Sequence, residues 1–286
     1  MSTRADVLLR VDDLHTALAA GAQLLDVRWR LGERAGSGFD RYLQGHLPEA
    51  RFLDLEAVLT GPTVDPTLGR HPLPDLDQLG AGLGALGIDP ALPIVVYDDP
   101  GSFAAGRAWW VLRWAGLHVR VLDGGLAAWV ASGNLLETAE PEAAFGLPLA
   151  LTAGHLPTLD GDGVAGFDGT LIDVRAPERY RGEVEPIDAQ AGHIPGAVNR
   201  PVGAFWAVDG TLPDESELKE LLALPAGTPS EEGAEPTVAV YCGSGVSAAQ
   251  VILALASLGV DAALYPPSWS GWSADPSRPV VVGTDG

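Results

Sequence analysis

Residues 238–247 of this chain read Val-Ala-Val-Tyr-Cys-Gly-Ser-Gly-Val-Ser. The segment begins as a short apolar run, passes through the only cysteine and two glycines, and leads into the apolar stretch 248–258. This order predicts a buried parallel strand, a tight loop and a helix. We therefore expect Cys242 at the carboxyl end of a strand, directly before the N-terminus of a helix.

This position favours chemistry at the sulfur of Cys242. Unpaired backbone N–H groups of the loop and the dipole of the following helix both stabilise negative charge there. The thiolate is the nucleophilic form of cysteine. The alternative is a cysteine that only packs at a strand end, since cysteine is among the most buried residue types. The flanking glycines, Gly243 and Gly245, favour the nucleophile.

Composition limits the classes of function. The 286 residues suffice for two domains, and 47% of them are hydrophobic. A formal net charge of −21 argues against a nucleic-acid or acidic-membrane partner. Lys219 is the only lysine, so arginine and backbone N–H groups would have to bind an anionic substrate.

The single cysteine excludes an intramolecular disulfide and a cysteine-rich zinc site. We expect no metal and no organic cofactor. No stretch approaches the roughly 18 apolar residues of a membrane helix, and the first ten residues hold no apolar leader segment. These observations predict a cytoplasmic protein without a membrane partner.

The chain contains an internal repeat. Three segments of the first half return in the second half, in the same order and at nearly constant spacing. The pairs are 24–28 (Leu-Leu-Asp-Val-Arg) with 171–175 (Leu-Ile-Asp-Val-Arg), 45–48 (Gly-His-Leu-Pro) with 192–195 (Gly-His-Ile-Pro), and 94–97 (Ile-Val-Val-Tyr) with 238–241 (Val-Ala-Val-Tyr). A period of this length indicates a duplicated domain.

Short apolar runs alternate with helical stretches within each copy, which predicts an α/β fold with a mainly parallel sheet flanked by helices. The expected elements of the first copy are strands near 23–27, 94–97 and 119–122, and helices near 11–20, 75–87 and 102–115. The predicted units are a first domain over 5–133, a linker over 134–167 and a second domain over 168–283. A surface loop is expected over 224–236.

The repeated Asp-Val-Arg strand, the Gly-His-Ile-Pro turn and the loop after Tyr241 resemble the tandem-domain rhodanese family over nearly the whole chain. This family comprises the thiosulfate and 3-mercaptopyruvate sulfurtransferases. The resemblance implies that Cys242 carries sulfur as a persulfide. Asp98 stands at the corresponding position of the first copy, so the resemblance implies an inactive first domain and a catalytic second domain.

The site expected around Cys242 binds anions. The backbone N–H groups of Gly243, Gly245, Val246 and Ser247 form a nest for the persulfide and the donor. Ser247 has a second interpretation, as the N-cap of the following helix. Arg179 matches the family's substrate-binding arginine, and Arg181 is a second candidate for that role.

Two signals conflict on the sulfur donor. Mercaptopyruvate-type enzymes usually carry another arginine eight residues after the position of Arg179, where this chain has Ile187. Thiosulfate enzymes usually carry basic residues directly after the cysteine, where this chain has the neutral Gly243 and Ser244. Because the loop touches the reacting sulfur, we favour mercaptopyruvate slightly.

Mercaptopyruvate-type enzymes are also thought to use a Ser-His-acid relay, in which the first domain contributes the histidine and the acid. By resemblance these residues are Ser244, His71 and Glu56. The chemistry needs such a group, since the leaving enolate requires a proton. His46 and His193 recur in both copies and are expected to bond the backbone of their turns.

The other recurring polar residues, Asp26 with Arg28 and Asp173 with Arg175, are expected to form ion pairs or strand-end caps. The tryptophans at 109, 110, 114 and 129 are expected in the core and between the domains.

Two alternatives to a sulfurtransferase differ in class. A cysteine-dependent phosphatase needs an arginine six residues after the cysteine to clamp phosphate, and Ala248 stands there. A persulfide carrier or redox-sensing binding module would accept one sulfur and stop. For the enzyme, the expected partners are a small-molecule sulfur donor, a thiol or cyanide acceptor and a thioredoxin-like reductant.

Overall fold

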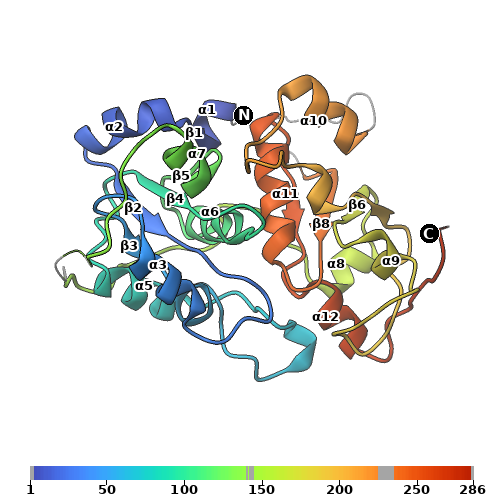
Figure 1. Ribbon diagram of the computed structural model, residues 1–286. Coiled ribbons are helices and arrows are strands. Elements are labelled where there is room, and N and C mark those ends of the chain that lie inside the picture. Colours follow the sequence, from blue (N-terminus) through green and yellow to red (C-terminus); the bar gives the residue numbers. More distant parts are fainter. Residues whose placement is uncertain (1–2, 140, 142–144, 225–234, 285–286) are drawn as a thin grey trace.

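The computed structural model describes residues 3–139, 141, 145–224 and 235–284. Two α/β units lie side by side, the first in blue to green and the second in yellow to red (Figure 1). No helix within these ranges is both long enough and apolar enough to cross a bilayer.

The first unit contains α1 (Arg4–Val7), β1 (Leu8–Leu9), α2 (Val11–Ala19), β2 (Gln23–Asp26), α3 (Ser37–Gln44), β3 (Arg51–Phe52), α4 (Leu55–Val58), the 3-10 helix η1 (Pro66–Leu68), α5 (Leu76–Ala85), β4 (Ile94–Tyr97), α6 (Ala104–Trp114), β5 (Val119–Leu122) and α7 (Gly125–Ala131). The second unit contains α8 (Gly161–Ala165), β6 (Thr170–Asp173), α9 (Pro177–Tyr180), β7 (Val198–Asn199), the 3-10 helix η2 (Val202–Ala204), α10 (Glu215–Leu222), β8 (Val238–Tyr241), α11 (Val246–Ser257), β9 (Ala263–Leu264) and α12 (Ser268–Ala274).

Each unit is built on a parallel sheet. The strand order is β1-β5-β4-β2-β3 in the first and β7-β6-β8-β9 in the second. All strand pairs are parallel, and the registers of the central pairs correspond: Leu25 lies opposite Val96, and Ile172 opposite Val240. The predicted fold class is confirmed. The central strands are fully buried because helices cover both faces, which explains their continuous apolar sequences.

The repeat extends to polar contacts in the core. Arg28 holds Asp26 through Nε and Nη2, and Arg175 holds Asp173 in the same way. The second Nη2 contact of each arginine is a turn carbonyl, that of Gly45 or Gly192. The structure confirms the predicted ion pairs, which fasten a strand end to a turn in both units.

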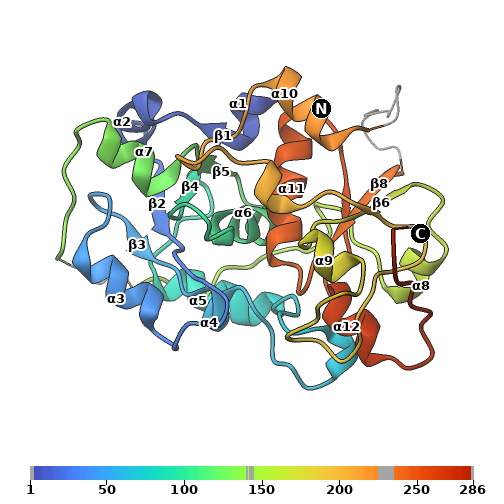
Figure 2. The same ribbon diagram turned by 45° about the vertical axis from the view of Figure 1, so that its right-hand side comes forward.

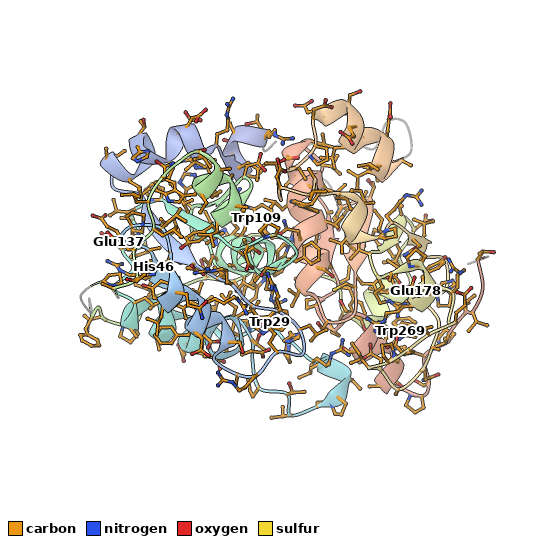
Figure 3. All side chains as sticks on the ribbon, viewed as in Figure 1. Trp29, His46, Trp109, Glu137, Glu178 and Trp269 are labelled. Carbon is orange, nitrogen blue, oxygen red and sulfur yellow. The ribbon has the colours of Figure 1, made fainter. Side chains whose placement is uncertain are left out.

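The two turn histidines hold equivalent places. Nδ1 of His46 lies 2.8 Å from the carbonyl oxygen of Tyr42, and Nδ1 of His193 lies 2.8 Å from that of Tyr180. Burial lowers the pKa of His193. His46 lies on the side of the first unit that faces away from the second (Figure 3). These contacts confirm the expected structural role.

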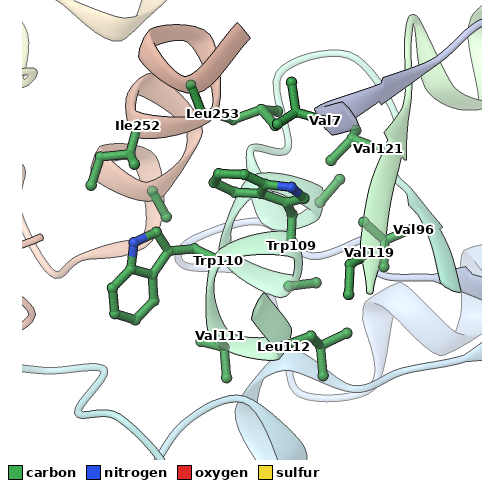
Figure 4. Packing of buried hydrophobic residues seen from close by; sticks show 14 of the residues in the cluster. Val7, Val96, Trp109, Trp110, Val111, Leu112, Val119, Val121, Ile252 and Leu253 are labelled. Atoms are coloured by element: carbon green, nitrogen blue, oxygen red, sulfur yellow. The ribbon is translucent and has the colours of Figure 1, made fainter. Parts of the chain in front are cut away.

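Helices α6 and α11 pack against each other and join the two units. Trp109 and Trp110 of α6 are buried beside Ile252 and Leu253 of α11 (Figure 4). This confirms the interdomain packing expected for Trp109 and Trp110. Trp129 belongs instead to a separate core of the first unit. The shared apolar core fixes the loops at the ends of both sheets relative to one another.

The start of α11 differs from one expectation of the sequence, that Ser247 is the N-cap. Helix α11 begins at Val246 with Gly245 as its N-cap, so Ser247 is not the cap. The left-handed backbone of Gly245 takes that position.

The expected linker over 134–167 contains α8, and its backbone N–H groups bond both units, from Leu149 to the carbonyl of Gly80 and from Leu159 to that of Leu264. The surface loop expected over 224–236 falls mostly outside the described residues. The domain limits stay a prediction.

Candidate active site

Cys242 follows β8 and lies beside the N-terminus of α11. Its sulfur accepts backbone N–H groups from Gly245 at 3.1 Å and from Ser244 at 3.4 Å. Gly245 has φ +80°, and a Cβ there would lie 2.7 Å from the carbonyl oxygen of Pro266. A side chain at this position would therefore be strained and would displace the loop. The loop aims two donors at the sulfur, as the sequence of glycines led us to expect.

A pocket of about 410 Å³ opens at Cys242 between the two units. Its lining from the second unit includes Gly243, Ser244, Val246, Ser247, Arg175 and Arg179. Its lining from the first unit includes Trp29, Arg30, Arg70, Ser102 and Phe103. Gly245 does not line the pocket, although its backbone N–H donates to the sulfur of Cys242.

The three candidate relay residues meet at the domain boundary. Nδ1 of His71 lies 2.7 Å from Oγ of Ser244, and Nε2 lies 3.3 Å from Oε1 of Glu56. His71 is buried, whereas 54% of the Glu56 side chain is exposed. The arrangement forms a path from solvent, through Glu56 and His71, to the hydroxyl two residues after Cys242.

Trp29 supports this arrangement from the first unit. Its Nε1–H donates to Oε1 of Glu56 at 3.0 Å, and its ring meets the His71 ring edge-on with centroids 5.2 Å apart. The hydrogen bond from His71, with a smaller contribution from Trp29, lowers the pKa of Glu56 against the opposing effect of burial. In Figure 3, Trp29 lies toward the region between the two units. No motif of the sequence indicated a role for Trp29.

Arg107 is a second residue that sequence analysis missed. It is fully buried in α6, and its Nη2 donates to the carbonyls of Leu59, His71 and Pro72. Its Nη1 donates to the carbonyl of Gly245 at 3.4 Å. Burial lowers the pKa of Arg107 to about 10. This one guanidinium connects the histidine loop of the first unit to the cysteine loop of the second.

The predicted substrate arginines have different surroundings. Arg179 lines the pocket, where its Nε and Nη2 bond Glu185 and its Nη2 also bonds Asp188 at 2.9 Å. Arg181 is not among the lining residues; its guanidinium pairs with Glu183 on the surface, so the structure does not bring it to the site. Arg181 is the C-cap of α9, two residues after Arg179, and this offset of about half a helical turn gives its side chain a different direction.

Arg70 and Asp188 complete the charged cluster. Arg70 of the first unit contacts Oδ1 of Asp188, whose Oδ2 binds Arg179. Hydrogen bonds from Arg179 and from backbone N–H groups outweigh burial and lower the pKa of Glu185. Burial raises the pKa of Asp188, although Arg70 opposes it. One buried carboxylate thus bridges arginines from both units.

The first unit has a different group at the equivalent strand end. Asp98 follows β4 where Cys242 follows β8, and its carboxylate accepts the backbone N–H of Ala105 at the start of α6. A separate pocket of about 340 Å³ lies here, lined among others by Asp98, Phe103 and Trp206. Burial raises the pKa of Asp98 to about 7. The first unit thus carries a buried acidic group at the strand end where the second unit carries the thiol.

No group of three or more histidine, cysteine or acidic side chains within the described ranges is arranged to hold a metal ion.

Comparison with known proteins identifies the family. Residues 10–132 and 159–275 each match the rhodanese-like domain. The chain belongs to the rhodanese family. It is 46% identical over 293 residues to SseB of Mycobacterium tuberculosis, provisionally named a thiosulfate sulfurtransferase, with 99% of this chain and 100% of that protein covered.

A second relative, whose name gives a different sulfur donor, matches a similarly large part of the chain. The 3-mercaptopyruvate sulfurtransferase of Escherichia coli is 35% identical over 279 residues, covering 90% of this chain and 91% of that protein. The crystal structure of SseA from Escherichia coli, described as a 3-mercaptopyruvate sulfurtransferase with the rhodanese fold, superposes with a TM-score of 0.78 at 31% identity, covering 92% of this chain and 98% of that one. The predicted family and sulfurtransferase activity are confirmed, and the two names leave the donor open.

Proposed function

We propose that this rhodanese takes sulfur from 3-mercaptopyruvate onto Cys242 and passes it to a thiol or to cyanide. The observation that carries the proposal is the 2.7 Å contact between His71 and Ser244, placed directly beside the Cys242 loop. A donor whose leaving group must be protonated needs such a group. Sulfite, which leaves from thiosulfate, does not.

The first half-reaction moves one sulfur atom. The Cys242 thiolate attacks the thiol sulfur of mercaptopyruvate, so that an S–S bond forms and the C–S bond breaks. The electron pair of the C–S bond leaves on the enolate of pyruvate, and the proton of the donor thiol ends on its methyl carbon. In the proposed step Ser244 and His71 carry this proton and Glu56 stabilises the histidine when it is charged; the contacts of His71 with Ser244 and with Glu56 support these roles.

The second half-reaction regenerates the thiolate. Cyanide or a thiolate attacks the outer sulfur of the Cys242 persulfide, and the electron pair of the S–S bond returns to Cys242. Between the two steps the persulfide is anionic. The N–H groups of Ser244 and Gly245 already point at the sulfur. We propose that the N–H groups of Gly243 in the loop and of Val246 and Ser247 in the first turn of α11 extend this nest around the outer sulfur.

The charged cluster supports mercaptopyruvate as the donor. Arg70 and Arg179 carry two positive charges, and Glu185 and Asp188 balance them with two negative charges. A cluster in which the charges of these two arginines are balanced suits a donor with a single carboxylate better than the thiosulfate dianion. Gly243 and Ser244, which follow Cys242, are neutral and therefore also favour mercaptopyruvate over the thiosulfate dianion.

We further propose a cytoplasmic enzyme, because a chain with a single cysteine has no intramolecular disulfide that would point to an oxidising compartment. There a thioredoxin-like reductant is the proposed final acceptor, since a dithiol can release the sulfur as sulfide.

The test compares kcat/KM for 3-mercaptopyruvate and thiosulfate with cyanide as the common acceptor. The proposal predicts clear preference for mercaptopyruvate in the wild type. Arg179→Ala should raise KM for this donor and leave kcat less affected, as expected when ground-state binding is lost. Preference for thiosulfate would refute the proposed donor. Transfer of a single equivalent without turnover would support the carrier or redox-sensing alternative instead.

A further inference from the structure

We propose that Arg107, a buried arginine of the first domain, is the counter-ion of the Cys242 thiolate. This inference deepens the proposed function and rests on Cys242 being its nucleophile. It follows from the burial of the guanidinium, from its contact with the cysteine loop and from the pairing of the other cations around that loop. Arg107 acts on the reaction through Cys242, so it is a positioning residue.

Helix α6 brings Arg107 to the boundary between the domains. Figures 1 and 2 both show α6 and α11 side by side. Nη1 of Arg107 donates to the carbonyl of Gly245 at 3.4 Å, and a Cβ built on Gly245 would lie 3.3 Å from the same nitrogen. The N–H of Gly245 in turn donates to the sulfur of Cys242 at 3.1 Å. A single residue of the loop therefore contacts both the guanidinium and the sulfur.

The positive charge of Arg107 has no carboxylate partner among the described residues. Its Nε has no hydrogen-bond partner within the same ranges, and its Nη2 bonds only backbone carbonyls, those of Leu59, His71 and Pro72. A buried charge is costly unless an opposite charge faces it. The fully buried guanidinium thus requires an anion that no acidic residue of the described chain supplies.

The other cations around the cysteine loop and its pocket are already balanced. Each of them faces a carboxylate: Arg30 faces Asp99, Arg70 faces Asp188, Arg175 faces Asp173, Arg179 faces Glu185, and His71 faces Glu56. Opposite charges that lie close together largely cancel at a third group. The guanidinium of Arg107 is therefore the positive charge that is left to stabilise an anion at Cys242.

The attraction between the two groups is mutual. Burial lowers the pKa of Arg107 to about 10, and the negative charge of Cys242 opposes that effect. The guanidinium is therefore charged at neutral pH, and it stabilises the thiolate by the same interaction. Because both groups are buried, salt screens the pair only weakly. The same charge stabilises the anionic persulfide between the two half-reactions.

The first domain shows an acidic group at a strand end without such a counter-ion. Asp98 follows β4 and accepts the backbone N–H of Ala105, and no arginine or lysine of the described ranges forms an ion pair with it. Burial raises its pKa to about 7. Backbone donors at the start of a helix thus do not outweigh burial there. At Cys242 the donors of the loop act together with Arg107.

The experiment measures the ionisation of Cys242 without a sulfur donor. Iodoacetamide is uncharged and reacts with thiolates, and Cys242 is the only cysteine, so the alkylation rate reports this group alone. The rate is followed over roughly pH 4.5 to 9.5. The variants are Arg107→Gln, which is neutral and keeps an amide donor for the carbonyls, and Arg107→Lys, which keeps the charge.

Leu253→Ala is the matched control for loosening of the domain contact. Leu253 is buried in α11 beside Trp109 of α6 and carries no charge (Figure 4). Near-ultraviolet circular dichroism establishes that each variant is folded before the assay. Sucrose in the buffer, which stabilises folded states, extends the comparison to a variant of reduced stability.

We expect Arg107→Gln to move the midpoint of the alkylation profile upward by roughly one to two pH units. The rate at a pH below both midpoints then falls about 10- to 100-fold. Arg107→Lys should move the midpoint by less than about half as much, because the ammonium keeps the charge. Leu253→Ala should leave it within about 0.3 pH unit of wild type, although the cavity lowers stability.

An unchanged midpoint in Arg107→Gln would overturn the inference. An equal upward shift in Leu253→Ala would overturn it too, because loosening of the domain contact would then explain the change. So would a shift in Arg107→Lys as large as that in Arg107→Gln, since charge would not be the cause. Turnover with 3-mercaptopyruvate is measured separately. The expected shift without turnover of this donor would support the ion pair and contradict the proposed donor.

Discussion

His71 of the first domain and Ser244 of the second are joined by a 2.7 Å contact between Nδ1 and Oγ. The only thiol of the protein lies two residues before that hydroxyl. The active site is thus completed only when the two domains are packed together. The apolar contact between α6 and α11, together with Arg107, holds this arrangement.

Removal of the histidine should affect the two sulfur donors unequally. We expect His71→Ala to lower kcat for mercaptopyruvate by roughly 100-fold or more, which is the usual contribution of general acid–base catalysis. Thiosulfate turnover should fall by less than about threefold, because sulfite leaves without a proton. Steady-state assays with both donors measure this difference. Equal losses of turnover with both donors would contradict the proposed role of His71 in proton transfer.

Arg107 should contribute to stability as well as to geometry. Arg107→Met leaves the carbonyls of Leu59, His71 and Pro72 without their shared donor. We expect the free energy of unfolding to fall by about 2–4 kcal/mol, measured by urea denaturation. Arg34→Gln, on the exposed surface, should change it by no more than about 0.5 kcal/mol. A stability equal to wild type for Arg107→Met would show that its hydrogen bonds make no net contribution.

Asp188 should set the balance between donors. Asp188→Asn removes one negative charge between Arg70 and Arg179 and leaves the cluster positive. A dianion gains more from this change than a monoanion, so the ratio of kcat/KM for thiosulfate to that for mercaptopyruvate should rise roughly three- to tenfold. An unchanged or lower ratio would argue against the electrostatic explanation of specificity.

The raised pKa of Asp98 should make the free energy of unfolding depend on pH. Burial raises its pKa in the folded protein to about 7, from the ordinary value of 3.8. Between those values the folded state holds a proton that the unfolded state has released, so this carboxyl makes the protein less stable as the pH rises. Because Asp98 lines a pocket and is only partly buried by surface area, we expect an effect of roughly 1–3 kcal/mol instead of the full ~4 kcal/mol.

The variant Asp98→Asn isolates this effect. It keeps an oxygen that can accept the N–H of Ala105 and cannot release a proton. Urea denaturation of both proteins at pH 4.5, 6 and 7.5 should show a stability difference in favour of the variant that grows with pH. A constant difference would mean that the carboxyl titrates normally.

Much of the architecture was predictable from the sequence because its determinants are local. The repeated Asp-Val-Arg segments identified β2 and β6, and Val238–Tyr241 with the following glycines identified β8 and the start of α11. The error at Ser247 is also local: the left-handed conformation of Gly245 moves the cap two residues earlier.

The remaining parts of the site depend on contacts between the domains. Arg70 and Arg107 lie far from Cys242 in the sequence, and only packing of the first domain on the second brings them to its loop. A signal existed for Arg107, since a lone arginine within the first turns of an apolar helix requires buried partners. No comparable signal distinguished Arg70 from Arg181, which the structure places on the surface.

The most direct test of the persulfide mechanism is the mass of the intact protein after incubation with 3-mercaptopyruvate and without an acceptor. We predict that the wild type gains the mass of one sulfur atom, located on Cys242 by peptide mapping, and loses it when cyanide is added. Cys242→Ser should gain nothing and should retain less than about one hundredth of the turnover. Turnover of the wild type without a sulfur adduct on Cys242, or substantial turnover by Cys242→Ser, would contradict the persulfide mechanism.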